Sequence, residues 1–119
     1  MNRTKTAEEL AQMTREQLDG LPYGVIELDA DGRILTYNAG EAELSGRQPE
    51  KVIGKNFFTQ VAPCTDVRDF HGRFVDLIEH RSVNHEFDFV FTFDPPVTVH
   101  IIMLYEQEEK TVWVIVERK

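Results

Sequence analysis

Phenylalanines alternate with other residues at Phe87, Phe89, Phe91 and Phe93. Successive side chains of a β-strand point to opposite faces of a sheet, so this spacing puts all four rings on one face. Pro95-Pro96 follows and must end the strand, because proline cannot donate a hydrogen bond to its neighbour. The pattern therefore predicts a strand with one apolar face, which has to pack against another layer.

Four other runs have the composition of β-strands: Tyr23 to Leu28, Arg33 to Tyr37, Val97 to Tyr105 and Thr111 to Glu117. Capping residues, prolines and glycines between the second and third strands indicate several short helices, and a longer helix is expected from Asp69 to about His80. The order of two strands, helices and three strands predicts an α+β fold. We expect a five-stranded antiparallel sheet with the helical connector on one face.

Residues 1 to 20 are predicted to form a short helical cap on a core of residues 21 to 119. Thr6 and Thr14 each begin a pattern with capping-box spacing. A segment with few apolar anchors is expected to have a low local unfolding free energy, although a frayed terminus without a role fits the same residues. The apolar anchors are Leu10, Met13 and Leu18.

The length of 119 residues fits one domain. The formal net charge of −8 argues against binding to nucleic acid or to an anionic membrane surface, because both depend largely on Lys and Arg. No run approaches the ~20 apolar residues that span a bilayer, and the N-terminus lacks the apolar core of a signal peptide. We therefore expect a soluble cytoplasmic protein.

Cys64 is the only cysteine in the chain. A single cysteine excludes an intramolecular disulfide and a zinc site built from several thiolates. The remaining roles for Cys64 are a packed small side chain, a nucleophile or a covalent tether. Burial is favoured for the cysteine considered by itself. His71 or His100 could serve it as a base, but oxyanion-hole glycines and a family signature for a thiol enzyme are missing from the sequence.

Tyr37 and Glu41 lie four residues apart across a junction between a strand and a helix. Both could project between the sheet and the connector, with Asn38 as the helix N-cap. The alternative is a half-buried tyrosine and a capping glutamate that faces solvent. Leu35 is expected to share the strand face of Tyr37.

Several segments together closely resemble the photoactive yellow protein family, which are blue-light photoreceptors with a PAS fold. The resemblance runs from about Leu18 to Lys119. The run from Gly54 to Asp66, which contains Cys64, is highly specific. The segments are Tyr37-Asn38-Ala39-Gly40-Glu41, Ser45-Gly46-Arg47, Val52-Ile53-Gly54-Lys55-Asn56-Phe57-Phe58, Val61-Ala62-Pro63-Cys64-Thr65-Asp66 and Trp113-Val114.

The resemblance implies a photoreceptor rather than an enzyme, with p-coumaric acid (4-hydroxycinnamic acid) bound to Cys64 as a thioester. It implies that Tyr37 and Glu41 hydrogen-bond the phenolate oxygen of the pigment. Ser45 takes the place of a supporting hydroxyl, and Arg47 gates the pocket. No metal is implied.

A phenolate buried among Phe57, Phe58 and Phe91 needs strong hydrogen-bond donors. Tyr37 can donate, and Glu41 can donate only if burial keeps it protonated. We hypothesise that light isomerises the pigment, that Glu41 then gives up its proton, and that the buried carboxylate releases the cap to an unknown signalling partner. The expected oligomeric state is a monomer or weak dimer, and the alternative function is a PAS-type binding or dimerisation module without pigment.

Two departures from the family stand out. The loop at Asp94-Pro95-Pro96-Val97 is shorter than usual and lacks a methionine that assists the return to the dark state, which predicts slow dark recovery. His71 replaces an aromatic hydroxyl. It is expected to be exposed on the surface, although a histidine at this place could make the photocycle respond near neutral pH.

Overall fold

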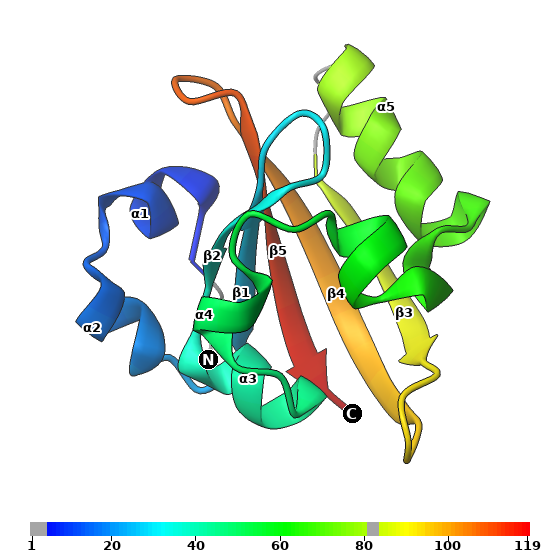
Figure 1. The fold of residues 1–119 in the computed structure, drawn as a ribbon. Coiled ribbons are helices and arrows are strands. Elements are labelled where there is room, and N and C mark those ends of the chain that lie inside the picture. The colour runs from blue at the N-terminus through cyan, green and yellow to red at the C-terminus, as the bar shows by residue number, and fades with distance from the viewer. Residues whose placement is uncertain (1–4, 81–83) are drawn as a thin grey trace.

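A computed structural model describes residues 5–80 and 84–119 and contains one five-stranded sheet (Figure 1). The strand order is β2-β1-β5-β4-β3, and every neighbouring pair is antiparallel. The predicted α+β fold is confirmed, and the ends of four strands lie within one residue of those expected from the sequence. The phenylalanine strand begins earlier than Phe87 and ends at Phe91, so Phe93 lies outside it. The strands are β1 (Gly24–Leu28), β2 (Ile34–Tyr37), β3 (His85–Phe91), β4 (Val97–Glu106) and β5 (Thr111–Arg118).

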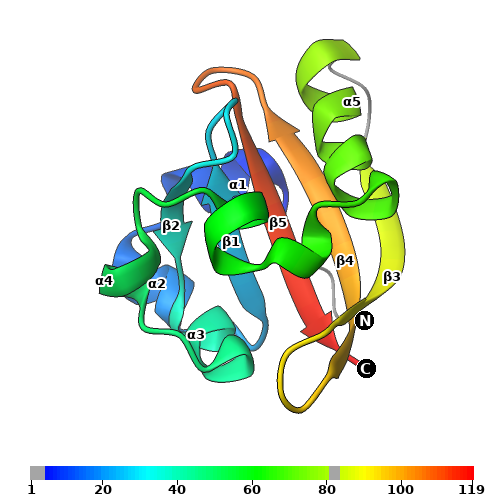
Figure 2. The ribbon, with the colours of Figure 1, turned by 45° about the vertical axis from the view of Figure 1, so that its right-hand side comes forward.

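Short helices between β2 and β3 cover one face of the sheet, here called the inner face (Figure 2). The predicted long helix begins as the turn η3, at Arg68, and continues into α5. Among the residues that the structure describes, no helix is long and apolar enough to cross a membrane. The elements are α3 (Ala39–Ser45), α4 (Pro49–Val52), η1 (Phe57–Val61), η2 (Pro63–Thr65), η3 (Arg68–Gly72) and α5 (Arg73–His80).

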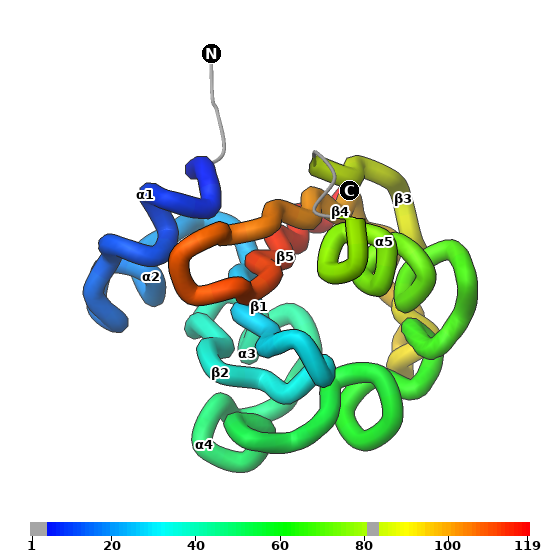
Figure 3. The backbone as a smooth tube through the Cα atoms, turned by 90° about the horizontal axis from the view of Figure 1, so that it is seen from above, coloured from blue at the N-terminus to red at the C-terminus, as the bar shows by residue number. Residues whose placement is uncertain are grey.

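The N-terminal helices α1 (Ala7–Gln12) and α2 (Arg15–Asp19) lie on the opposite, outer face (Figure 3). Both predicted capping boxes form, with Thr6 and Thr14 as the N-cap residues. We call residues 5–20 the cap; residues 1–4 of the predicted cap lie outside the described residues. Its buried side chains pack on apolar residues of β1, β4 and β5 in a cluster separate from the main core. Those cap side chains are Ala7, Leu10 and Leu18.

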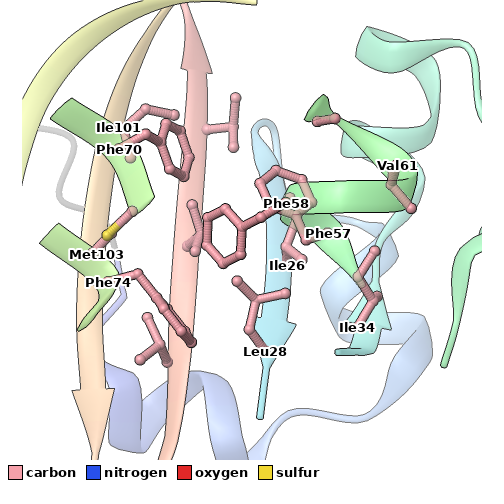
Figure 4. Packing of buried hydrophobic residues seen from close by; sticks show 14 of the residues in the cluster. Ile26, Leu28, Ile34, Phe57, Phe58, Val61, Phe70, Phe74, Ile101 and Met103 are labelled. Atoms are coloured by element: carbon pink, nitrogen blue, oxygen red, sulfur yellow. The ribbon is translucent and has the colours of Figure 1, made fainter. Parts of the chain in front are cut away.

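The main core lies between the inner face and the helical connector (Figure 4). The rings of β3 point into it while Glu86, Asp88 and Val90 are exposed, as the alternation predicts. Phe70, from η3, is fully buried and contacts Phe57 and Phe58 as well as the β3 rings. The aromatic stripe therefore binds the connector to the far edge of the sheet.

A bulge in the β1–β2 ladder overturns one prediction. Leu28 pairs with Ile34 although Glu27 pairs with Thr36, so Leu35 is skipped. The extra residue reverses the alternation along β2. Ile34 is consequently buried with Tyr37, whereas Leu35 is 45% exposed and does not share the face of Tyr37.

Candidate functional site

Glu41 lies at the start of α3 and is buried, with only 1% of its surface exposed. Asn38 is the N-cap, and its side chain accepts a hydrogen bond from the Glu41 backbone N–H at 3.0 Å. The carboxyl therefore does not serve as a solvent-facing cap. It occupies the space left by Gly24, where a Cβ atom would collide with Oε1.

Oε1 of Glu41 has no hydrogen-bond partner among the described residues. Burial without a compensating partner disfavours the charged form. It raises the pKa of Glu41 from 4.5 to about 8. The carboxyl is accordingly protonated at neutral pH and can donate a hydrogen bond within the core.

Tyr37 ends β2 and points inward, with 4% of its surface exposed. Its hydroxyl oxygen lies 2.7 Å from Oγ of Ser45, the last residue of α3. Burial, and secondarily the charge of Glu41, raises the pKa of Tyr37. The phenol thus stays protonated and is a second donor near Glu41.

Cys64 lies in η2 and is only partly buried. It packs against the same apolar cluster that contains Tyr37, Phe57 and Phe91. The preceding turn, η1, is fixed by the side chain of Asn56, which accepts hydrogen bonds from the first backbone N–H groups of the turn at 2.9 and 3.2 Å. The connector therefore brings the thiol to the core that encloses the two acid donors.

Arg47 is exposed at the end of this site, with its guanidinium carbon 5.9 Å from the ring centre of Phe93. Phe93 stacks on Phe91, with ring centres 4.9 Å apart and an interplanar angle of 8°. Phe91 is fully buried, whereas Phe93 is only partly buried. The three side chains are therefore stacked in the order Phe91, Phe93 and Arg47 from the core to the solvent.

The two histidines considered for Cys64 have other partners. His71 stacks on Phe58 at 3.9 Å and places Nδ1 2.7 Å from Asp66, so the prediction of a simply exposed side chain is wrong. His100 lies on the outer face between the carboxylates of Asp88 and Glu86, at 2.7 and 2.8 Å. These hydrogen bonds, first that of Asp88, raise the pKa of His100.

Asn38 does more than the N-cap role that the sequence indicated. Its Oδ1 also accepts a hydrogen bond from Val25 N at 2.8 Å, and its Nδ2 donates to Leu18 O at 2.8 Å and to Tyr23 O at 3.1 Å. One buried amide therefore joins the cap, β1 and the helix of Glu41. Sequence reasoning missed this role and that of Gly24, since both depend on contacts between distant segments.

The site combines a thiol, two buried proton donors and a wall of aromatic rings. Such a set suits a flat aromatic group held covalently by Cys64. The donors Glu41 and Tyr37 suit an anionic oxygen on that group, because O–H···O⁻ hydrogen bonds are strong. The donor set of this chain thus fits a phenolate pigment.

Residues 12–119 match the PAS fold family. The chain is 43% identical to photoactive yellow protein of Rhodothalassium salexigens and 40% identical to that of Halochromatium salexigens. Each alignment covers 92% of this chain and 88% of the relative. The chain belongs to the photoactive yellow protein family. It is therefore a blue-light photoreceptor and not an enzyme, within a family whose members carry a chromophore.

A solved structure agrees with this membership. The photoactive yellow protein domain of a sensor histidine kinase from Rhodospirillum centenum superposes with a TM-score of 0.89 at 43% identity. The match covers 93% of this chain and 98% of that domain. The photoactive yellow protein fold is thus preserved over nearly the whole chain.

Proposed function

We propose that this photoreceptor carries p-coumaric acid as a thioester on Cys64, with the phenolate oxygen held by Glu41 and Tyr37. The observation that carries the proposal is the buried Glu41 Oε1, which has no partner among the described residues. A buried polar atom without a partner is costly, so its presence favours a ligand that uses it. The phenolate oxygen of the pigment would accept a hydrogen bond from the protonated carboxyl of Glu41.

Attachment requires an activated p-coumaroyl group, such as a thioester of a carrier thiol or an anhydride. The Cys64 sulfur attacks the acyl carbon, and the bond from that carbon to the carrier group breaks. The thiol proton of Cys64 passes to the departing carrier, so no oxidant or reductant is needed. The partial exposure of Cys64 supports access by such a reagent.

The site residues would hold the pigment in its ionised form. Glu41 and Tyr37 donate to the phenolate, Ser45 holds the Tyr37 hydroxyl, and the aromatic walls exclude water. Phe57 and Phe91 are both fully buried and contribute to those walls. An ionised phenol absorbs at longer wavelength than a neutral one, so the donors also tune the colour.

When bound, the p-coumaroyl group supplies a light-absorbing phenolate and a double bond that isomerises on excitation. Glu41 would then lose its proton to the displaced oxygen. A carboxylate in this position is buried and poorly paired, which is unfavourable by several kcal/mol. The start of α3 would have to move to hydrate it.

The hydrogen bonds of Asn38 offer a route from that movement to the cap. Leu18 O receives one of them, and Ala39 N donates to Oδ1 of Asp19 at 2.8 Å. Both connect α2 to the N-terminus of α3. Release of the cap would expose the outer face to a signalling partner, and we expect this to take place in the cytoplasm.

The attachment is tested by mixing the pigment-free protein with p-coumaric anhydride in the dark. We expect a yellow product, with the mass gain of one p-coumaroyl group on Cys64. The Cys64→Ser variant is the control and should stay colourless. If the accessible thiol gave no adduct, the chain would instead be a PAS-type binding or dimerisation module.

The proton transfer is tested separately with Glu41→Gln. An amide keeps a hydrogen-bond donor but cannot give up a proton in this way. We expect a shifted absorption maximum and a much weaker loss of cap protection in hydrogen exchange under light. Wild-type absorption together with wild-type light-induced exchange would refute the role of Glu41.

A further inference from the structure

A groove of about 660 Å³ lies between the cap and the β2 edge of the sheet, and Cys64 is not among the residues that line it. Figure 3 shows the cap and α4 on the two sides of β2. Leu35 and Ile53 are each 45% exposed at this groove, which is unusual for large aliphatic side chains that line a concave surface. The apolar lining includes Leu10, Ala11, Met13, Leu35, Ile53 and Trp113.

Acidic residues surround this apolar lining. Seven of the described residues that line the groove are Asp or Glu, whereas Arg15 is the one basic residue among them. They come from the cap, β1, α4, the end of β4 and the turn between β4 and β5. Glu50 and Glu108 are exposed, so their charges face the solvent at the mouth. The groove is therefore apolar inside and negative at its rim.

Trp113 supplies an independent sign of a missing partner. The residue lies on β5 between Glu27 and Leu104 of the neighbouring strands and is 3% exposed. Its indole N–H has no hydrogen-bond acceptor among the described residues. Buried tryptophan N–H groups usually find an acceptor, so this donor favours a ligand with a carbonyl oxygen.

We propose that this groove binds a segment of a partner protein in which aliphatic side chains alternate with Lys or Arg. The aliphatic side chains would fill the apolar lining, and the basic groups would pair with the acidic rim. A backbone carbonyl of the segment would accept from the Trp113 N–H. The inference does not depend on the pigment.

Charge excludes the other classes of occupant. Nucleic acid and anionic lipid would be repelled by the rim, since both carry negative charge. A second copy of this chain, with a net charge of −8, would bring a second acidic surface. Only a basic partner gains from the rim and the apolar lining together.

The test uses the full chain in the dark and a synthetic peptide of about ten residues that alternates leucine with lysine, a length that spans about 33 Å when extended. Trp113 is the only tryptophan, so its indole N–H gives one NMR resonance that reports directly on the groove. We expect a saturable shift of this resonance and of the Leu35 and Ile53 amides. A leucine–glutamate peptide of the same length should produce no shift.

The double variant Glu50→Lys/Glu108→Lys should weaken binding of the leucine–lysine peptide about tenfold, because two attractions become repulsions. Glu43→Lys/Glu79→Lys is the matched control, since both residues are exposed and lie outside the groove. It should change the affinity less than about twofold. Equal weakening by both variants, shifts confined to other surfaces, or no saturable binding would overturn the proposal.

Discussion

The two faces of the sheet are covered in different ways. The inner face carries a continuous aromatic and aliphatic core beneath the connector, from α3 to α5. The outer face carries a smaller cluster, to which the described part of the cap contributes three buried side chains, Ala7, Leu10 and Leu18. Hydrophobic stabilisation scales with buried apolar area, so we expect the cap to unfold locally at a lower free energy than the sheet and connector.

The two faces also differ in how they tolerate a change of charge on a titratable side chain. On the inner face, burial keeps Glu41 neutral, and loss of its proton would create a buried charge that solvent cannot hydrate. On the outer face, His100 lies among carboxylates near solvent, where a change of charge is readily hydrated. Under the proposed function, a proton transfer from Glu41 would leave an unfavourable buried charge on the inner face, and release of the cap on the outer face would relieve it.

The largest expected effect comes from a matched pair of leucines that are both 0% exposed, Leu77 of α5 and Leu10 of α1. Leu77→Ala should lower the global free energy of unfolding by about 2–5 kcal/mol. Leu10→Ala should lower it less and should mainly accelerate hydrogen exchange in α1 and α2. Chemical denaturation and hydrogen exchange measure the two effects, and equal global losses would mean that the cap is part of the main cooperative unit.

The next effect is a pH dependence of stability in the pigment-free protein. The folded-state pKa of Glu41 is raised from 4.5 to about 8, so its stability contribution is fully present below pH 4.5 and is lost as the pH rises toward 8. The slope from this one group approaches about 1.4 kcal/mol per pH unit within that window. Glu41→Gln should remove this slope, as measured by urea denaturation from pH 4.5 to 8.

The same titration distinguishes the two faces. His100 also has a raised pKa, so its contribution likewise declines as the pH rises through that value. His100→Asn should nevertheless change the slope much less than Glu41→Gln, because His100 is close to solvent. A larger change in the His100 variant would place the dominant titrating group on the outer face.

The smallest effect concerns the capping boxes. Thr6→Ala removes the side-chain acceptor for Glu9 N, which lies at 3.1 Å, and should destabilise α1 by about 1 kcal/mol. Because we expect the cap to open before the sheet, the change should appear in the exchange rates of α1 and scarcely in the global midpoint. Thr6→Ser is the control and should retain the wild-type rates.

The sequence predicted the strands and capping boxes because these depend on local spacing. The alternation of the phenylalanines and the four-residue patterns at Thr6 and Thr14 carry their own geometry. The bulge at Leu35 could not be predicted in this way, since it depends on how β2 pairs with β1. A single skipped residue was enough to reverse the expected face.

The site was less accessible to local reasoning. Considered alone, Glu41 was favoured as a solvent-facing capping residue and Cys64 as a packed side chain. The spacing of Tyr37 and Glu41 allowed both to project between sheet and connector, but only the resemblance to a family joined them with Cys64 in one pocket. The burial of Glu41 depends on Gly24, which precedes it by 17 residues and supplies empty space instead of a contact. The stacking of His71 on Phe58 likewise follows from the path of the connector.

Slow dark recovery, expected from the short loop at Asp94-Pro95-Pro96-Val97, stays a prediction.

Asn38 has a consequence for the thermodynamics of signalling. Its amide contacts the cap and the first turn of α3 at once, and both Asn38 and Tyr37 also line the outer groove. If deprotonation of Glu41 changes the affinity of the groove for a partner by some factor, the partner must change the proton affinity of Glu41 by the same factor. A partner bound in the groove would then change the proton affinity of Glu41. The absorption maximum of the pigment and the lifetime of its light-activated state would therefore depend on whether the groove is occupied.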